Sequence, residues 1–402
     1  MSTTKILEHP DVTILGGGPI GLLAALCLAR RLPEVRRIRL IAGRKLPPAD
    51  GRAAAIVGRS MQILDGLTRA DGTTLDAIFR DEGAPLASIR IIDVTGRLLR
   101  APTTNFHARD TGQAHFGISL TTQRIVALLR EATQESGRIE ILPVDIKAIT
   151  RQESGFTLTD DQGKTHVAPF LLAADGQRSL AREAAGIAVK RWSYPQMALT
   201  FSLKHQRDHH DISTEFHTNE GPFTLVPAGY QQSTVVWMMG PETAERLLAL
   251  DDIDFARAAE KTCRSLLGAF SLTSPRGSYP MGGLLAERFV DQGIALLGET
   301  AHAFPPIGAQ GLNLGFRDAD TLADALVRIF AAGEDLSTSR HLMQWERERR
   351  RDVTLRTASV DAFNRSLLTD FLPVTVLRSL GLFALNSIPP LRRSVMRAGL
   401  AQ

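Results

Sequence analysis

The sequence predicts a mixed α/β (α+β) fold: a Rossmann-like domain, an interleaved β-sheet domain and a C-terminal helical segment. Three observations indicate this fold. A glycine-rich turn separates a short β-rich apolar run, 11–15, from a run of helical composition, 22–31. Strand-like alternation fills residues 196–239. Helical spacing of apolar residues then returns at 312–332 and 341–363. With 44% hydrophobic and 22% charged residues, the 402-residue chain has an ordinary globular composition.

The glycine-rich turn belongs to a β-α-β unit. A second β-rich run, 38–42, follows the helical run, and the crossover between two such strands requires them to be parallel in one sheet. Further along, apolar residues from Ile125 to Ala132 recur at helical spacing. The runs after this helix that read as strands are 139–142, 156–159 and 170–174, with a hairpin turn at 160–163.

Composition and spacing exclude several classes of protein. The two cysteines, Cys27 and Cys263, lie far apart without a CxxC spacing, so we expect neither disulfides nor a metal site. The N-terminus has no apolar run of signal-peptide length, and glycines interrupt the uncharged stretch 12–29, so we expect a cytoplasmic protein without a membrane span. The net charge of +4 permits contact with anionic lipid, but we expect no nucleic-acid partner.

Signatures of other enzymes are missing from the sequence. It contains no HExxH and no GxSxG, and the Gly163-Lys164-Thr165 run lacks the glycine that a P-loop needs at position 158. The basic run of Arg347, Arg349, Arg350 and Arg351 alternates with glutamates, so we expect it to form a solvated helix face.

The first chemical signature is the GxGxxG pattern of Gly16, Gly18 and Gly21, with Pro19 between them. The first glycine permits a tight turn, the second lets backbone N–H groups approach a pyrophosphate, and the third lets the helix pack on the strand. The helix N-terminus then faces the phosphates. Glycine clusters also make plain turns, but a strand before and a helix after this one favour a dinucleotide site.

One expected partner of this signature is missing. The second strand of such a site ends in an acid that hydrogen-bonds the adenosine ribose, whereas here it ends in Leu40, Ile41, Ala42, Gly43 and Arg44. We therefore expect weaker binding of the adenosine half and tighter binding after Ala42→Glu. A phosphate-preferring site at Arg44 is the alternative, although an arginine after a strand is usually solvated.

The second signature, Asp175, Gly176, Ser179 and Arg182, follows an apolar strand. Asp-Gly after a strand also ends simple hairpins. The third signature is GETAHAFPPIGAQGLNLGFRDAD, residues 298–320, which also follows an apolar strand. A carboxylate at such a strand end can accept hydrogen bonds from sugar-like hydroxyls, and the helix N-terminus after the glycine-rich loop presents N–H groups to electron-rich oxygens such as isoalloxazine carbonyls.

With these three signatures in this order, the chain resembles the class A flavoprotein aromatic hydroxylases, and within them the ubiquinone-biosynthesis hydroxylases. The resemblance spans nearly the whole chain. Asp175, Gly176, Ser179 and Arg182 match the family motif that contacts both FAD and the nicotinamide donor, and Gly298 matches the motif that binds the ribityl chain. Glu299 departs from the family, which usually has Asp there, and the longer acid shifts the expected ribityl contact.

Further matches favour the ubiquinone branch. They lie after the second strand, on the helix that follows, at the start of the substrate sheet and in the tail: Asp50, Arg52, Ala55, Gln123, Arg124, Leu128, Leu129, Trp192, Tyr194, Gln196, Asp352, Phe363, Arg378, Gly381, Leu382, Pro390 and Arg392. We expect the FAD-binding domain to comprise 1–75, 112–186 and 278–345. The substrate-binding sheet domain comprises 76–111 and 187–277, and the C-terminal helical segment comprises 346–402.

The resemblance implies a set of cofactor-binding residues and leaves the catalytic residues unknown. The set is Gly16, Gly18, Pro19, Gly21, Arg52, Gln123, Asp175, Gly176, Ser179, Arg182, Gly298, Glu299, Pro306, Gly308, Gln310, Gly311 and Asn313. His302 is a catalytic candidate because it lies inside the third signature. The candidate is weak, since a lone histidine is more often packed or solvated.

By resemblance, the protein is an FAD-dependent monooxygenase of a polyprenylated phenol on the way to ubiquinone. NAD(P)H reduces the flavin, and dioxygen then forms a C4a hydroperoxide that hydroxylates the ring. Two alternatives stay open: a flavoprotein hydroxylase or reductase of another small molecule, and a non-catalytic flavoprotein scaffold in a quinone-biosynthesis complex. A prenylated substrate implies peripheral contact with the inner face of the membrane, for which 367–393 is the candidate, unless that segment packs on the core.

Overall fold

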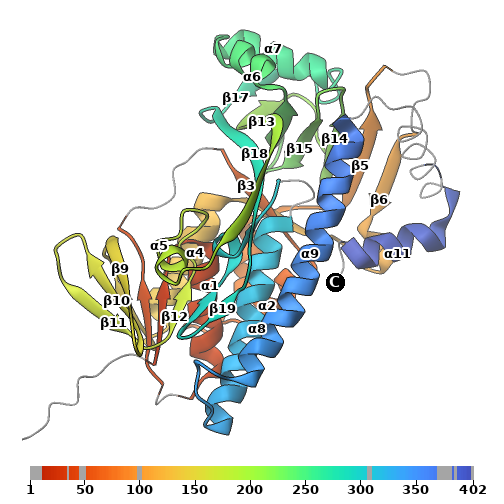
Figure 1. Ribbon diagram of the computed structural model, residues 1–402. Helices are drawn as coiled ribbons and strands as arrows, with labels where there is room; N and C mark the ends of the chain where they lie inside the picture. The colour runs from red at the N-terminus through yellow and green to blue at the C-terminus, as the bar shows by residue number, and fades with distance from the viewer. Residues whose placement is uncertain are drawn as a thin grey trace, which may run out of the picture.

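The structure is a computed structural model, which describes residues 11–33, 36–44, 51–96, 102–305, 310–368, 383 and 387–399. The described residues form two large sheets (Figure 1). A six-stranded, mostly parallel sheet with its helices lies at one end, and a nine-stranded sheet lies at the other. This arrangement confirms the mixed α/β fold that the sequence predicts.

The six-stranded sheet carries the glycine-rich turn. Its strands are β1 (Val12–Leu15), β2 (Ile38–Ile41), β8 (Ile139–Leu142), β12 (Leu171–Ala173), β19 (Val290–Asp291) and β20 (Ile294–Leu296). Their order is β19-β20-β12-β1-β2-β8, and all neighbours are parallel except β19 and β20. All four residues of β1 are buried, which explains why this strand is a continuous apolar run rather than an alternating one.

A layer of helices packs beside this sheet. At its centre is α1 (Pro19–Arg31), which contacts both α4 (Thr122–Glu135) and α8 (Gln310–Ala332). All residues of α1 from Gly21 to Ala29 are buried, so α1 is a core helix rather than an amphipathic surface helix. A long helix, α9 (Arg340–Leu368), packs along α8 and continues past it toward the nine-stranded sheet (Figure 1).

The nine-stranded sheet is formed by segments that lie far apart in the sequence. Its strands are β5 (Ser88–Asp93), β6 (Thr104–His107), β13 (Val189–His205), β14 (Ile212–His217), β15 (Pro222–Pro227), β16 (Gln232–Met239), β17 (Phe270–Leu272), β18 (Gly277–Ala286) and β21 (His302–Ala303). Their order is β21-β18-β13-β16-β15-β14-β5-β6, with β17 pairing on β13. Only β14 and β5 pair in parallel. Because β21 belongs to the third signature, this sheet and the glycine-rich loop of that signature are directly connected.

The two faces of the nine-stranded sheet have different neighbours. Successive side chains on a strand point to opposite faces. On one face, Leu199, Phe201 and Leu203 of β13 form an apolar core with the helices α6 (Pro241–Leu248) and α7 (Asp252–Thr262). Phe201 meets Phe255 of α7 edge to face, with ring centroids 4.9 Å apart. The other face, which carries Ala198 and Thr200, is left for a pocket.

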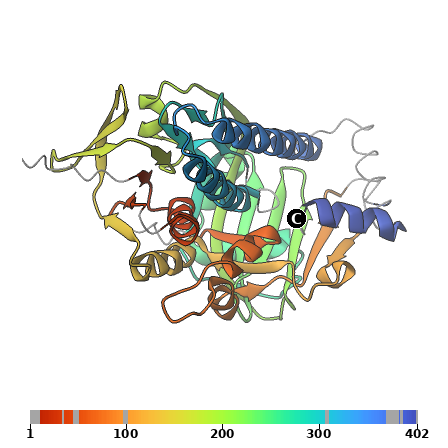
Figure 2. The same ribbon diagram turned by 90° about the horizontal axis from the view of Figure 1, so that it is seen from below.

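Two small sheets and the remaining helices complete the described chain. The sheets are β3 (Ala53–Val57), β7 (Gly117–Thr121) and β4 (Ala84–Pro85), and β11 (Thr165–Ala168), β10 (Gly155–Asp160) and β9 (Ile146–Gln152). The helices are α2 (Arg59–Asp65), α3 (Leu75–Glu82), α5 (Leu180–Ala184), α11 (Pro389–Gly399) and the 3-10 turns η1 (Ala108–Thr111) and η2 (Gly298–Thr300). Seen from below, β9 to β11 and α11 lie at opposite ends of the molecule (Figure 2).

Most predicted elements are present, with shifted bounds. The strand at 139–142 has the predicted limits, whereas β13 begins at Val189, before the predicted start at residue 196. Among the described helices, none is both long and apolar enough to cross a bilayer. The prediction of a solvated arginine face is wrong at Arg349, which is buried, and holds at Arg347 and Arg351, which are exposed. Most of the tail from 369 to 386 lies outside the described residues.

Candidate active site

The first signature forms a turn that requires glycine at its first and third glycine positions. Gly16 has a φ of 129°, and a β-carbon placed on it would lie 2.2 Å from the Ala174 carbonyl oxygen. A β-carbon placed on Gly21 would lie 2.0 Å from the Gly16 carbonyl oxygen. At Gly18 the same carbon would have no described atom within 4 Å. The backbone therefore packs closely at Gly16 and Gly21, and there is open space at Gly18.

The start of α1 faces this open space. Pro19 is the first helical residue, and within the described chain neither a side-chain cap nor an acid lies in the first turn. The first N–H groups of the helix therefore keep their hydrogen-bonding capacity, and its positive end is not neutralised. These are the features that a pyrophosphate requires, so the turn fits a dinucleotide.

The second signature is an acid held by its own loop. Asp175 accepts hydrogen bonds from Ser179 Oγ at 2.6 Å, the Ala181 N–H at 3.2 Å and Thr300 Oγ1 at 3.4 Å. Ser179 also caps α5, because its Oγ accepts the Arg182 N–H at 2.9 Å. Burial raises the pKa of the Asp175 carboxyl, and these hydrogen bonds oppose the rise. Gly176 donates its N–H to Thr300 Oγ1 at 3.0 Å, which ties the second signature to the third.

Arg182 is a buried connection between the same two signatures. Its guanidinium donates to the Thr300 carbonyl oxygen at 2.8 Å and to the Gln177 carbonyl oxygen at 2.9 Å. Burial and the nearby charge of Arg191 lower the pKa of Arg182. Arg182 is only 2% exposed. It therefore stabilises the loop around Asp175 from the protein interior.

The third signature begins with a glycine in the left-handed region of backbone conformation. Gly298 has a φ of 56° and donates its N–H to Asp318 Oδ2 at 3.1 Å, while a β-carbon on it would lie 3.0 Å from the Ile20 side chain. The next residue, Glu299, is exposed and lines the pocket. Asn313, on α8, donates to the Ala55 carbonyl oxygen at 2.8 Å and accepts the Val57 N–H at 3.1 Å, so it fixes α8 to β3.

His302 is buried and forms part of the support of this loop. Its Nε2 lies 2.7 Å from Asp318 Oδ2, and its ring stacks on Phe304 with centroids 5.7 Å apart and an interplanar angle of 9°. Its Nδ1 has no hydrogen-bond partner in the described part of the chain. His302 is not among the residues that line the pocket, whereas Phe304 is.

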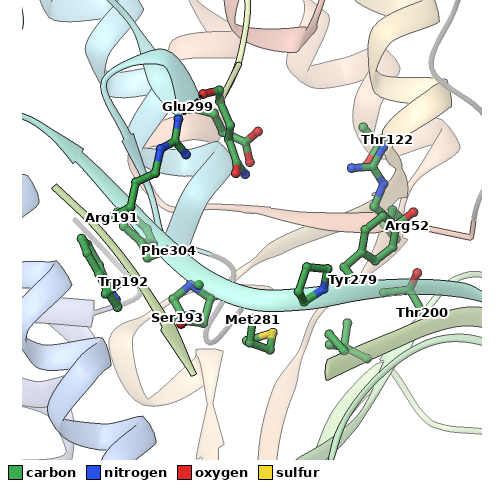
Figure 3. A pocket seen from close by; sticks show the side chains of 18 of the residues that line it. Arg52, Thr122, Arg191, Trp192, Ser193, Thr200, Tyr279, Met281, Glu299 and Phe304 are labelled. Carbon is green, nitrogen blue, oxygen red and sulfur yellow. Dashed lines mark hydrogen bonds between the residues drawn. The ribbon is translucent and has the colours of Figure 1, made fainter. Parts of the chain in front are cut away.

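A pocket of about 640 Å³ lies between the signatures and the open face of the nine-stranded sheet. Arg191 and Glu299 lie toward one end of it in Figure 3, and Arg52, Thr122 and Tyr279 lie toward the other. The Arg52 guanidinium lies over the Tyr279 ring, 5.4 Å from its centroid. The apolar floor comes from the strands β13, β16 and β18 and comprises Ala198, Val236, Pro280 and Met281.

Trp192 of β13 lies opposite Gly283 of β18. Because glycine has no side chain, the Trp192 indole can lie over it and close one side of the pocket. A β-carbon on Gly283 would lie 2.1 Å from the Trp192 indole. The indole donates its Nε1–H to the Tyr194 hydroxyl at 3.0 Å, and that hydroxyl donates to Asp361 Oδ1 at 2.6 Å. Asp361 lies on α9, so this helix fixes the orientation of the pocket wall.

The structure brings together some of the predicted site residues and leaves others apart. Arg52 and Glu299 line the pocket, and Gln123 is next to Thr122, which also lines it. Gln310 and Gly311 begin α8, and no described atom lies within 4 Å of a β-carbon on Gly311. Pro306 and Gly308 lie outside the described residues. The prediction missed the lining residues Gln177, Arg191, Phe304 and Met281, although Gln177 and Phe304 lie inside the second and third signatures.

Comparison with known proteins gives a consistent result. Residues 9–355 match the family model of an FAD binding domain. Ubiquinone hydroxylase UbiL of Rhodospirillum rubrum is 32% identical over 394 residues, which cover 96% of this chain and 88% of that protein. The 3-demethoxyubiquinol 3-hydroxylase of Escherichia coli is 25% identical over 405 residues, which cover 98% and 99%.

The fold is also that of a monooxygenase of known structure. The p-nitrophenol 4-monooxygenase PnpA from Pseudomonas putida matches with a TM-score of 0.79 over 98% of each chain, at 18% identity. The uncapped start of α1 and the open space above Gly18 fit an FAD pyrophosphate, as the family match requires. The chain belongs to the FAD-dependent class A hydroxylase family that includes the ubiquinone hydroxylases, and its cofactor is FAD.

Proposed function

We propose that the protein is a monooxygenase that hydroxylates the aromatic ring of a polyprenylated phenol in ubiquinone biosynthesis. The observation that carries this proposal is the pocket, which joins an apolar floor to the exposed acid of the third signature. When bound, FAD supplies the oxygen activation and takes reducing equivalents from NAD(P)H. The protein's own task is to hold the ring close to the cofactor and to exclude water.

The pocket residues suit this task. The floor of Ala198, Val236 and Met281 offers an apolar surface to a ring, and methionine adapts to substituents on it. Thr200 and Thr234 bring hydroxyl groups to the same wall, which can orient a phenol. Trp192 keeps its position because its indole N–H donates to the Tyr194 hydroxyl, which in turn donates to Asp361.

For the cofactor, we propose that the first and third signatures hold FAD and that the second signature supports them. The Gly16-Gly18-Pro19-Gly21 turn takes the pyrophosphate, and Glu299 takes the ribityl hydroxyls. Arg52, Gln123 and the start of α8 at Gln310 and Gly311 surround the flavin ring. The loop of Asp175, Gly176, Ser179 and Arg182 and the clamp made by Asn313 keep these groups in position. In this proposal the six-stranded sheet is the core of the FAD-binding domain and the nine-stranded sheet forms the substrate wall.

A prenylated substrate implies contact with the membrane surface. Within the proposed contact segment, 367–393, the structure describes residues 367, 368, 383 and 387–393, which include the start of α11. Met396 anchors α11 among buried apolar residues beside Phe106 and Phe116. Ile388 and Leu391 are 47% and 41% exposed. Arg393 is also exposed. Apolar side chains next to arginine are the combination that binds an anionic lipid surface.

A second function is favoured by one observation. The guanidinium groups of Arg52 and Arg191 both line the pocket, and they would suit a smaller aromatic substrate that carries a carboxylate. The two functions differ in the substrate that stimulates NAD(P)H oxidation.

The experiment supplies purified, FAD-loaded protein with NADH or NADPH and measures oxidation and product mass with two phenols. One carries a short prenyl chain, and the other carries a carboxylate instead. Stimulation and hydroxylation of the prenylated phenol support the first function, and preference for the carboxylated phenol supports the second. A flavin-free protein, or one inert toward both phenols, contradicts both and favours a scaffold.

A pair of variants shows whether the observed reaction uses this pocket. Met281→Trp fills the apolar floor and should uncouple NAD(P)H oxidation from hydroxylation while FAD content is retained. The matched control is Met343→Trp, because Met343 lies on α9 with 47% exposure and should tolerate the change. Equal coupling in the two variants would mean that the ring binds elsewhere.

A further inference from the structure

The end of β2 lacks a side chain that can bind a ribose. Ala42 follows β2 and is 3% exposed. Its β-carbon would lie 2.8 Å from a β-carbon placed on Gly17, so residue 42 faces the glycine-rich turn. Residue 43 is also a glycine. Neither residue that follows β2 directly therefore offers a carboxylate to a ribose.

The neighbouring strand provides one. β8 pairs in parallel with β2, so both strands end at the same edge of the sheet. Asp145 follows β8 by three residues, and its Oδ1 lies 2.6 Å from the point where Gly43 would carry a β-carbon. In the described part of the chain, the Asp145 carboxylate makes no hydrogen bond or ion pair. A carboxylate with no partner among the described residues thus lies against the backbone at the end of β2.

Arg44 and Asp161 hold this acid in place. The Asp161 N–H donates to the Asp145 carbonyl oxygen at 2.9 Å. The Arg44 guanidinium pairs with Asp161 Oδ2 at 2.9 Å and donates to the Pro143 carbonyl oxygen at 3.0 Å. Arg44 is therefore engaged in fixing the loop 143–145 beside β2, which argues against its role as a phosphate ligand.

A cation from α4 borders the same place. Arg130 Nη2 donates to the Gly43 carbonyl oxygen at 3.2 Å and lies 3.3 Å from a β-carbon placed on Gly17. The Asp145 carboxylate and the Arg130 guanidinium thus both lie against Gly43, at the edge of the sheet where β2 ends. In sheets of this kind, that edge is where the adenosine of a dinucleotide lies.

We propose that Asp145 supplies the carboxylate that accepts hydrogen bonds from the ribose hydroxyls of the FAD adenosine, with Arg130 as a positioning residue that holds Gly43. Carboxylates are the usual acceptors for vicinal hydroxyls, and Asp145 has its acceptor capacity available. In this proposal Asp145, which follows β8, takes the role of the acid that the family has at residue 42. The absence of an acid at residue 42 then does not weaken the binding of the adenosine half of FAD. This inference rests on the FAD cofactor and is independent of the proposed substrate.

The test is FAD titration into flavin-stripped protein, followed by fluorescence quenching, for wild type, Asp145→Asn and Asp145→Ala. Loss of hydrogen bonds to a charged group predicts a rise in the FAD dissociation constant of about tenfold to a hundredfold for Asp145→Ala and less for Asp145→Asn. The matched control, Asp81→Asn, removes an exposed acid on α3 and should leave the constant unchanged. Unchanged affinity in both Asp145 variants overturns the proposal.

A double-mutant cycle with Ala42→Glu then tests the location of the contact. If Asp145 already serves the ribose, Ala42→Glu gains little affinity in wild type and restores much of it in Asp145→Asn. An equal gain in both backgrounds, or no restoration in Asp145→Asn, overturns the proposal. Thermal unfolding of the stripped proteins is the second measurement. If the Asp145 variants without flavin are destabilised enough to explain their lower affinity for FAD, Asp145 has a structural role only. That outcome also overturns the proposal.

Discussion

Arg349 Nε donates to Asp318 Oδ1 across 2.7 Å, with both side chains at most 7% exposed. Asp318 Oδ2 also accepts the Gly298 N–H and contacts His302 Nε2. One carboxylate therefore joins α8, α9 and the third signature. Burial disfavours its charge, but the charges and hydrogen bonds of His302 and Arg349 hold the pKa of Asp318 well below its usual range.

Removal of the guanidinium should destabilise the protein strongly. In Arg349→Gln the Asp318 charge stays buried and loses its guanidinium partner, which predicts a loss of about 3 to 5 kcal/mol in the free energy of unfolding. Urea unfolding followed by circular dichroism measures it. Arg351→Gln, on the exposed side of the same helix, is the control and should stay close to wild type. Equal, small effects of the two substitutions would contradict the buried pair.

The same carboxylate predicts how stability depends on pH. A carboxyl with a lowered folded pKa stabilises the protein above its unfolded pKa, near 3.8, and this contribution disappears as pH falls through the folded pKa. The difference in unfolding free energy between wild type and Asp318→Asn should therefore be largest near neutral pH and shrink in acid. Unfolding measured from pH 7 down to pH 3 checks this. A constant difference would mean that the charge of Asp318 contributes nothing.

Asp175→Ala should slow reduction by NAD(P)H more than it lowers FAD content. Asp175 organises its loop through Ser179 and Ala181, while the glycine-rich turn, which we assign to the pyrophosphate, does not depend on it. Rapid reduction kinetics on FAD-loaded protein give the rate. Ser179→Ala is the control for loop distortion, because it removes the α5 cap and leaves the carboxylate. An unchanged reduction rate in Asp175→Ala would remove this residue from the cofactor site.

The flavin should be bound without a covalent link. The two cysteines are buried, and burial raises the pKa of Cys27 to about 12 and that of Cys263 to about 11, so neither thiol is a nucleophile near neutral pH. Acid precipitation should leave all flavin in the supernatant, where mass spectrometry identifies it as FAD. Yellow colour retained in the pellet, or FMN in the supernatant, would contradict this prediction.

Association with membranes should be peripheral and should depend on the exposed side of α11. Leu391→Asp replaces an apolar contact with a charge that anionic lipid repels, so less protein should sediment with vesicles containing phosphatidylglycerol. Leu355→Asp is the control, because Leu355 is a 69% exposed residue of α9. Retained flavin shows that both variants are folded. Equal sedimentation of Leu391→Asp and wild type would place the contact elsewhere in the chain.

The elements around the first signature were predictable because their signals are local. β1, α1 and β2 each combine an apolar pattern with a turn that glycine must occupy, so their order and approximate bounds follow from a short stretch of sequence. The buried ties were not predictable. Arg182 meets Thr300, 118 residues away, and Arg349 meets Asp318, 31 residues away. The motif of Arg182 marks it as a site residue but does not indicate its contact with Thr300, and nothing in the neighbours of Arg349 distinguishes it from a solvated arginine.

The pocket floor could not be predicted for a related reason. Ala198 is opposite both Met238 of β16 and Tyr279 of β18, and only the register of these strands decides which side chains face the pocket. The register of β13 against β18 also shifts between Ser193 and Met197. This shift changes which residues of β13 face the pocket on its two sides, and alternation along the strand does not indicate it. Met281 and Arg191 therefore had no signal in the sequence, whereas Glu299 could be predicted from its motif.

The course of α9 limits how this enzyme could be recombined with its relatives. Near its start, Glu346 accepts the Phe289 N–H at 2.6 Å beside the six-stranded sheet. Near its end, Asp361 accepts from Tyr194, and Asn364 donates to Gln196 on β13 at 3.2 Å. A chimera that imports a foreign β13 but keeps its own α9 would leave Asp361 and Asn364 of α9 without Tyr194 and Gln196, their partners on β13. Productive crossovers should therefore transfer the second half of α9 together with the substrate wall, as one inherited block.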